Sequence, residues 1–310
     1  MKIKDILDET HIDDNYLITN VSKGVSSNAT TYLNVTLQDC TGTIEAKKWD
    51  ASIEDIELFT VGKILHIVGE ANKYRTVMQI KIMKAVEVDQ STIDFQDFVI
   101  SSPVPEKELE KQLVEYLEML KSPDVKSLTE KLINKYYKEY LTHPAATRNH
   151  HEYCSGLLHH SISVAHLVSV LADNYPSLDK EILIAGALLH DIGKVIEISG
   201  PIIPTYTTQG KLIGHISIMQ AEIRETAHEL GIKSEVPLLL EHMILSHHGK
   251  REFGSPVLPM TKEALVLNFA DDLDAKMNML EKAYENTEEG KFTNRIYALD
   301  DRTFYKPFKR

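Results

Sequence analysis

The C-terminal half of the chain contains histidines and aspartates that lie on or beside apolar, helix-like stretches. These residues are His160, His190, Asp191, His215, His247, His248 and Asp271. A buried polar group without a partner is costly, so each of these side chains needs one. Neutral imidazoles and carboxylates together suit Mn²⁺, Fe²⁺ or Mg²⁺, and they suit Zn²⁺ less uniquely. A site with enough ligands for two such ions can activate water for attack on a phosphate ester.

The strongest of these signals is the adjacent pair His190 and Asp191. The preceding residues, 181–189, predict an almost wholly apolar helix that ends at this pair. One metal ion would satisfy both side chains, and a carboxylate can also bridge two ions. We expect Gly193 to relieve the end of the helix and Lys194 to project beside the metals. A purely structural role for the pair is the alternative.

Several ligand assignments have a rival in the neighbouring residue. Adjacent positions of a helix point about 100° apart, so only one residue of each pair can face a given site. His159 competes with His160, His248 with His247, and Asp272 with Asp271. We favour His247 as the ligand and expect His248 to contact the substrate or a ligand. His215 follows Gly214, and its alternative role is to cap a helix.

Other residues are candidates for binding nucleic acid. Arg148, His150 and His151 precede the first metal helix and could grip backbone phosphates, as could Lys250 after the histidine pair. A solvated polar loop is the alternative. Near the N-terminus, Tyr32, Trp49 and Tyr74 could stack on bases, with lysines nearby in sequence. Packing of Trp49 in the core is equally compatible with the sequence.

Two kinds of element must position these residues. Segments rich in Val, Ile, Thr and Tyr between residues 15 and 90 predict five short strands, with Leu33, Val35 and Leu37 on one face. Together with a helical insert near 52–59, this pattern favours a small OB-type β-barrel, with another small barrel as the alternative. Prolines in residues 101–105 predict a linker. From Glu106 to about residue 274 the apolar spacing changes to that of helices.

The composition is that of an ordinary globular protein. The chain has 310 residues, 43% hydrophobic and 26% charged, with a net charge of −12. The negative charge argues against tight nonspecific binding to duplex DNA but permits single-strand binding on a local basic groove. We expect no transmembrane helix and no signal peptide. The two cysteines, Cys40 and Cys154, form no CxxC pair, so a cytoplasmic location is expected.

Three segments resemble the HD superfamily of metal-dependent phosphohydrolases. They are residues 157–165 (LLHHSISVA), 187–194 (ALLHDIGK) and 270–275 (ADDLDA). The resemblance implies that His160, His190, Asp191 and Asp271 hold a first metal ion, and its register selects Asp271 over Asp272. His215 and His247 resemble the extra histidines of two-metal members. By the same resemblance Lys194 would contact the scissile phosphate or help the leaving group, so Asp191 and Lys194 are the expected catalytic residues.

The whole chain also resembles the YhaM-type 3′→5′ exoribonucleases of Gram-positive bacteria. Further matching strings are 246–250 (SHHGK), 253–256 (FGSP) and 273–277 (LDAKM). The resemblance implies an OB-fold nucleic-acid-binding domain at 1–90, a linker and helical segment at 91–145, and an HD metal-dependent phosphohydrolase domain at 146–310. The expected fold class is therefore multidomain α and β, with a five-stranded barrel followed by an all-α helical bundle.

The implied activity is metal-dependent hydrolysis of single-stranded RNA from its 3′ end to nucleoside 5′-monophosphates. We expect two divalent ions, with Mn²⁺ first and Fe²⁺, Mg²⁺ and Co²⁺ as alternatives. Single-stranded DNA is an alternative substrate, and a homo-oligomer is compatible with the sequence. One rival function is a phosphohydrolase of free or cyclic nucleotides with a regulatory barrel. Another is a DNA-binding replication accessory protein.

Overall fold

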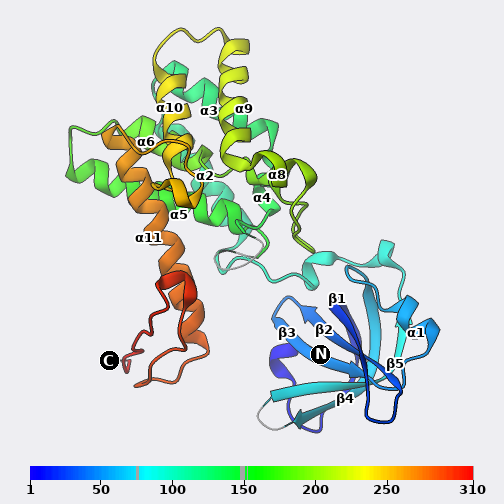
Figure 1. Cartoon of the computed structure of the whole chain (residues 1–310). Coiled ribbons are helices and arrows are strands. Elements are labelled where there is room, and N and C mark those ends of the chain that lie inside the picture. The colour runs from blue at the N-terminus through cyan, green and yellow to red at the C-terminus, as the bar shows by residue number, and fades with distance from the viewer. Residues whose placement is uncertain (75–76, 147–150, 152, 310) are drawn as a thin grey trace. The chain divides into compact units, whose positions relative to one another are not determined.

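The computed structural model describes residues 1–74, 77–146, 151 and 153–309. The chain forms two compact units, Met1–Ser101 and Ser102–Arg310, which are described separately (Figure 1). None of the helices in the described ranges has the length and apolar character needed to cross a bilayer. The helices α2 to α4 belong to the second unit. The predicted division of the chain at residues 90 and 145 stays a prediction.

The first unit is a closed barrel of five strands in the order β1-β2-β3-β5-β4. The strands are β1 (His11–Val25), β2 (Thr31–Asp39), β3 (Gly42–Lys48), β4 (Ile64–Tyr74) and β5 (Val77–Glu87). All neighbouring strands are antiparallel except β3 and β5, which are parallel. The five-stranded OB-type barrel predicted from the sequence is therefore confirmed.

Residue patterns account for the elements of the barrel. In β2, Leu33, Val35 and Leu37 are buried and alternate with more exposed residues, as the sequence predicts. The helical insert is α1 (Ile53–Leu58), between β3 and β4. Ser52 and Asp55 start this helix with a reciprocal capping box, which satisfies two backbone N–H groups. Short 3₁₀ turns, η1 (Ile3–Asp5), η2 (Gln90–Thr92) and η3 (Phe95–Asp97), flank the barrel.

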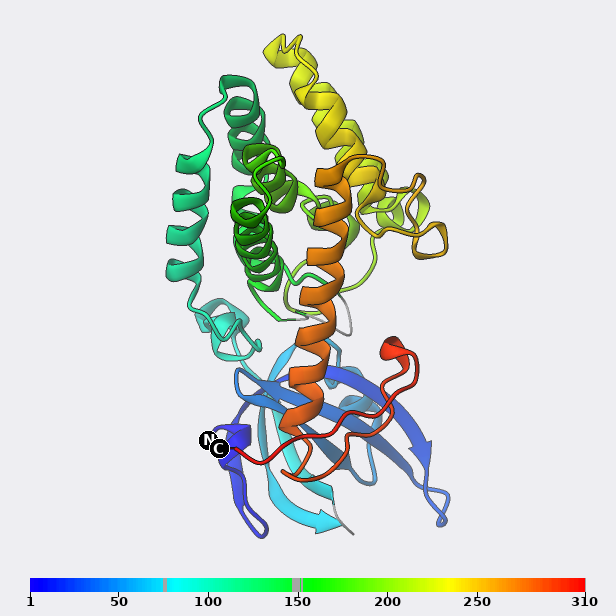
Figure 2. The ribbon, with the colours of Figure 1, turned by 90° about the vertical axis from the view of Figure 1, so that its left-hand side faces the viewer.

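The second unit is a bundle of helices with a single apolar core. Its helices are α2 (Glu106–Met119), α3 (Pro123–Lys135), α4 (Tyr137–Thr142), α5 (Gly156–Asn174), α6 (Lys180–Leu189), α7 (Lys194–Glu197), α8 (Thr208–Ile213), α9 (His215–Leu230), α10 (Val236–Ser246) and α11 (Lys262–Glu285). The described residues of this unit also form the 3₁₀ turns η4 (Arg251–Phe253) and η5 (Tyr297–Leu299). The middle of the bundle is α6, which is buried from Ile182 to Leu189 and packs against α3, α5, α10 and α11. Figure 2 shows the C-terminal half of α11 extending beyond the other helices.

The ends of α6 decide where the candidate site lies. At its start, the Asp179 carboxylate accepts hydrogen bonds from the backbone N–H groups of Glu181 and Ile182. At its end, the chain continues into His190 and Asp191 inside the core. We expected Gly193 to relieve the end of the helix, but its φ of −54° is helical and not the left-handed conformation of a glycine C-cap. A Cβ at Gly193 would lie 2.4 Å from the carbonyl oxygen of His215, so glycine is needed here for close packing.

Candidate metal centre

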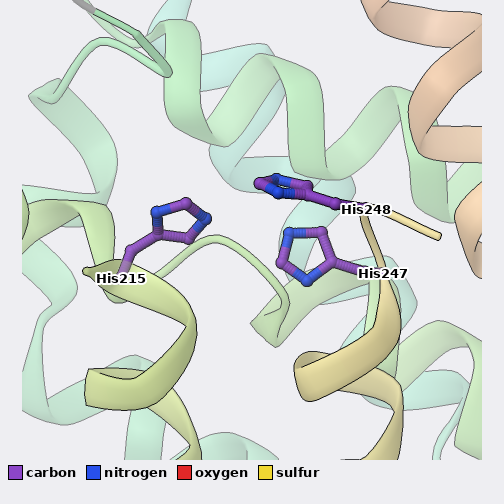
Figure 3. A group of neighbouring side chains, drawn as sticks. All are labelled: His215, His247 and His248. Atoms are coloured by element: carbon purple, nitrogen blue, oxygen red, sulfur yellow. The ribbon is translucent and has the colours of Figure 1, made fainter. Parts of the chain in front are cut away.

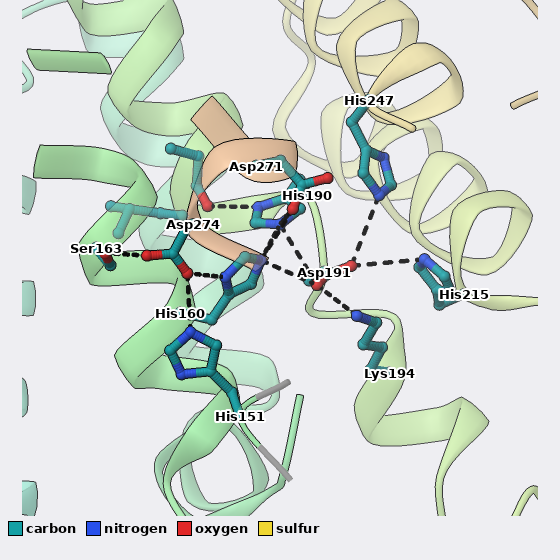
Figure 4. Close-up of polar contacts among 12 residues, drawn as sticks. His151, His160, Ser163, His190, Asp191, Lys194, His215, His247, Asp271 and Asp274 are labelled. Carbon is teal, nitrogen blue, oxygen red and sulfur yellow. Dashed lines mark hydrogen bonds and ion pairs between the residues drawn. The ribbon is translucent and has the colours of Figure 1, made fainter. Parts of the chain in front are cut away.

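The predicted ligands come from separate helices and meet inside the bundle (Figure 4). His160 lies on α5 and Asp271 on α11, while His215 is the first residue of α9. His190 and His247 each follow directly after the last residue of a helix, α6 and α10. The rings of His160, His190 and His247 are fully buried, and Asp191 is 2% exposed.

A hydrogen bond from Nδ1 orients each of the four imidazoles. His190 donates to the carbonyl oxygen of Ala187 at 2.8 Å, and His247 donates to that of Ile244 at 2.7 Å. His215 Nδ1 lies 2.9 Å from a Glu197 oxygen, and His160 Nδ1 lies 2.7 Å from Asp274 Oδ2. When Nδ1 carries the proton, Nε2 keeps its lone pair. Each ring is thus prepared to bind a cation through Nε2.

The Asp191 carboxylate lies between two sets of these nitrogens. Its Oδ2 is 3.4 Å from His190 Nε2 and 3.6 Å from His160 Nε2. Its Oδ1 is 3.5 Å from His215 Nε2 and 3.7 Å from His247 Nε2. Each oxygen therefore faces a different pair of imidazoles.

Asp271 lies beside the first pair of imidazoles. Its Oδ1 lies 3.1 Å from His160 Nε2 and 3.8 Å from His190 Nε2. The rival residues lie elsewhere, because Asp272 is exposed and paired with Lys276 at 2.6 Å, while His159 Nδ1 contacts the Tyr153 hydroxyl at 2.8 Å. In these two pairs, the favoured residue, His160 or Asp271, is the one that faces the cluster.

The unsatisfied atoms of this cluster are evidence that it holds cations. Among the described residues, Asp191 Oδ1, His215 Nε2 and His247 Nε2 are buried and have no hydrogen-bond partner. Leaving three such atoms unpaired is costly, and a single cation between them would satisfy all three. The nitrogens and oxygens of this set are the ligands that divalent Mn, Fe and Co ions accept. The residues therefore fit a divalent metal.

His248 also belongs to this cluster. One ligand atom each from His215, His247 and His248 lies within 4.8 Å of the others, and Figure 3 shows the three rings around one space. His248 Nδ1 donates to the carbonyl oxygen of Phe253 at 2.8 Å, so its Nε2 also keeps a lone pair. The turn after α10 points both adjacent rings toward this space, so His248 lies beside a candidate ligand, which is one of the two positions that we expected for it.

Lys194 brings a positive charge to the centre of the cluster. Its ammonium group lies 2.6 Å from Asp191 Oδ2, and both side chains are buried. Burial alone would raise the pKa of the Asp191 carboxyl, but Lys194 and His190 hold this pKa well below its usual range. Burial also opposes the charge of Lys194, yet Asp191 raises the pKa of its ammonium group. Both groups therefore stay charged at neutral pH.

Two carboxylates around the cluster were missed in the sequence. Glu197 accepts hydrogen bonds from both the backbone N–H and the ring of His215, at 3.1 and 2.9 Å. Asp274 contacts His160 Nδ1 at 2.7 Å and His151 Nε2 at 2.8 Å, and it accepts a hydrogen bond from the Ser163 hydroxyl. The available signal for Asp274 was its position one helical turn after Asp271. Glu197 gave no comparable signal.

The predicted phosphate-binding residues divide into three cases. Arg148 and His150 lie outside the described residues. His151 is 3% exposed and contacts Asp274 and the Tyr153 hydroxyl through its two nitrogens, so its position does not suit the predicted grip on phosphate. Lys250 is exposed, in the loop that follows His248.

The predicted stacking residues gather on one face of the barrel. The rings of Tyr32 and Trp49 lie 4.9 Å apart, and Lys47 Nζ is 4.9 Å from the first and 5.4 Å from the second. Trp49 is 41% exposed and Tyr74 63%, so the alternative of core packing for Trp49 is wrong. Beside them is a hollow of about 360 Å³, whose lining includes Lys47, Trp49, Asn72, Tyr74 and Lys81.

Comparisons with known proteins agree with both units. Residues 157–276 match the HD domain family, and residues 17–88 match the OB-fold nucleic acid binding domain family. The chain is 46% identical over 299 residues to the 3′-5′ exoribonuclease YhaM of Bacillus pumilus (strain SAFR-032), covering 96% of this chain and 95% of the relative. For the YhaM proteins of Geobacillus sp. (strain WCH70) and Bacillus subtilis (strain 168), identity is 45% and 44% over 297 residues. These matches cover 96% of this chain and 92% and 95% of the relatives. The chain therefore belongs to the YhaM family of 3′-5′ exoribonucleases.

Proposed function

We propose that this protein hydrolyses single-stranded RNA from its 3′ end with two divalent metal ions and releases nucleoside 5′-monophosphates. Family membership supports the 3′-5′ exoribonuclease activity, and the HD domain supports its dependence on divalent metal. The position of Asp191 carries the two-ion part of the proposal, because each of its oxygens faces a different pair of imidazoles. Mn²⁺ is the expected ion, and a cytoplasmic location belongs to the same proposal.

The proposed ligands divide into two sets that share one carboxylate. The first set is His160, His190, Asp191 and Asp271. The second set is Asp191, His215, His247 and His248, where His248 takes the role of a ligand in place of the expected contact with the substrate or with a ligand. The unpartnered Nε2 atoms of His215 and His247 support the second set. Glu197 and Asp274 hold the rings of His215 and His160 in place.

The residues around this centre have distinct tasks in hydrolysis. Two divalent ions, when bound, would lower the pKa of a water molecule, and their positive charge would stabilise the phosphate oxygens. Lys194 lies beside Asp191 as a buried, charged donor, and we assign it to the scissile phosphate or the leaving oxygen. The hydrogen bonds from Nδ1 keep the imidazoles from rotating, so little reorganisation energy is needed as charge develops.

We assign the barrel to the binding of single-stranded nucleic acid. The half-buried ring of Tyr32 lies beside the exposed ring of Trp49, Lys47 lies over both, and Tyr74 lines the neighbouring hollow. Stacking on aromatic rings accepts every base, because every base has a π-face. Such contacts suit an enzyme that degrades RNA of any sequence, and they also permit binding of single-stranded DNA.

One experiment tests the polarity, the product and the metal together. The full chain is incubated with a 5′-labelled single-stranded RNA in the presence of Mn²⁺, Mg²⁺, Fe²⁺ or Co²⁺, and the products are sized. A ladder that shortens with time, with release of nucleoside 5′-monophosphates, is expected. Immediate release of a labelled mononucleotide, or cleavage of a circular RNA, contradicts the proposed 3′→5′ direction.

Additional substrates separate the rival functions. Faster hydrolysis of free or cyclic nucleotides than of short oligoribonucleotides would favour a nucleotide phosphohydrolase. Binding of DNA without any hydrolysis, in the presence of each metal, would favour an accessory protein. Parallel digestion of single-stranded DNA measures the preference between the two nucleic acids.

A further inference from the structure

The loop that follows His248 is a compact turn that closes back on this histidine. Gly249 and Gly254 have φ values of +73° and +97°, a region that glycine occupies without strain. Within the turn, the N–H groups of Phe253 and Ser255 both donate to the carbonyl oxygen of Lys250, at 3.2 Å. The turn brings the carbonyl oxygen of Phe253 to 2.8 Å from His248 Nδ1. Phe253 is therefore fixed through its backbone to a residue of the metal cluster.

The side chain of Phe253 is free to contact a ligand. It is 59% exposed, although its backbone is held in a short 3₁₀ turn. Lys250 Nζ lies 5.1 Å from the centroid of the ring, so a cation accompanies the exposed aromatic face. An exposed phenyl ring contributes little to the core. Neither Phe253 nor Lys250 belongs to the ligand sets described above.

These contacts suit a nucleotide better than an apolar partner. A base can stack on the ring of Phe253, and the ammonium group of Lys250 can pair with a backbone phosphate. The turn is next to His248, one of the three imidazoles that surround the second proposed ion. A base that stacks here would belong to a nucleotide close to the reacting phosphate.

We infer that Phe253 is a positioning residue that stacks on the base of one of the two nucleotides flanking the scissile phosphate. This inference rests on the proposed exoribonuclease activity. Stacking fixes the distance between the terminal phosphodiester bond and the metal centre without distinguishing one base from another. The expected consequence is an enzyme that tolerates any base at the 3′ end but requires that a base be present.

The test combines changes in the protein with changes in the RNA. Three variants of the full chain are compared with the wild type: Phe253→Ala, Phe253→Leu and Phe253→Trp. Each is assayed on a 5′-labelled RNA and on matched RNAs that lack either the last or the penultimate base. The matched control is Tyr297→Ala, which removes another exposed aromatic ring of the second unit (91% exposed).

Phe253→Ala and Phe253→Leu are expected to lower kcat/KM on intact RNA by about 5- to 150-fold, the factor that stacking of about 1–3 kcal/mol gives. Phe253→Trp should restore most of the activity, and Tyr297→Ala should leave it unchanged. On one of the two abasic RNAs, the wild type and Phe253→Ala should become equally slow. Metal content measured by elemental analysis should be the same in all four variants.

Other results would overturn the inference. If Phe253→Leu retains full activity, an apolar contact suffices and the ring does not stack. If Phe253→Ala loses the same factor on intact RNA and on both abasic RNAs, or loses metal, Phe253 acts only through the backbone at His248. A wild-type chain that degrades no RNA refutes the proposed function instead, so the two failures are distinguishable.

Discussion

Asp274 offers a sharp test of how the chain holds its metal, because its carboxylate binds a proposed ligand without being one. Asp274 Oδ2 lies 2.7 Å from His160 Nδ1 and 2.8 Å from His151 Nε2, and Oδ1 accepts a hydrogen bond from Ser163. Asp274→Asn keeps the size of the side chain. The amide oxygen can still accept from both imidazoles, and the amide NH₂ can donate to the Ser163 hydroxyl. The substitution therefore removes the charge and preserves the contacts.

The size of the effect follows from the bonds that change. A hydrogen bond to a charged group contributes about 1.5–3 kcal/mol, against about 0.5–1.5 kcal/mol for a neutral one. Only the hydrogen bond to His160 acts directly on a proposed ligand, so the free energy of metal binding should weaken by about 1–1.5 kcal/mol. This corresponds to about a tenfold loss of affinity, the lower end of the range for outer partners of metal ligands.

The assay is a titration of RNA hydrolysis with Mn²⁺, supported by competition with a chromophoric chelator. Asp274→Asn is expected to raise the half-saturating Mn²⁺ concentration about tenfold and to approach the wild-type rate at saturation. The matched control is Asp272→Asn, since Asp272 is an exposed carboxylate on the same helix, paired with Lys276. An unchanged half-saturating concentration, or a rate that stays low at saturating Mn²⁺, refutes the reasoning.

Three further predictions follow from the same structure. Asp191→Ala should abolish hydrolysis and lower the metal content. The single substitution also leaves the buried Lys194 without its partner, so the double variant Asp191→Ala/Lys194→Met serves as the matched control. Full metal occupancy in either variant, measured by elemental analysis, would exclude Asp191 as a ligand. A chain that begins at Ser102 should hydrolyse a small activated phosphodiester with Mn²⁺ but degrade long RNA poorly, whereas equal degradation of long RNA at matched salt would exclude the barrel as the guide. Burial lowers the pKa of His159 from 6.5 to about 4, so the unfolded chain takes up this proton first as the pH falls. The free energy of unfolding should therefore decrease between pH 6.5 and 4. In urea unfolding, His159→Gln should weaken this decrease, and an unchanged pH dependence would contradict the prediction.

The sequence alone was sufficient for the fold class because both kinds of element leave a local periodic pattern. Leu33, Val35 and Leu37 alternate along one strand, and their burial follows that alternation. The apolar run before His190 predicted a buried helix with a polar pair at its end, and α6 has this form. These patterns depend on neighbouring residues only, so they can be read without knowing the tertiary structure.

The choice between adjacent candidates depended on the tertiary structure. His159 and His160 differ by one position on α5, and sequence spacing does not say which side of that helix faces α6 and α11. The supporting carboxylate of His160 is Asp274, which lies 114 positions further along the chain. Gly193 is required because the backbone at His215 approaches it closely, and no local pattern records that approach. Local propensity and periodicity determine the helices and strands. The hydrogen-bond partners of buried polar groups such as His160 come from distant segments of the chain, which only tertiary packing brings near.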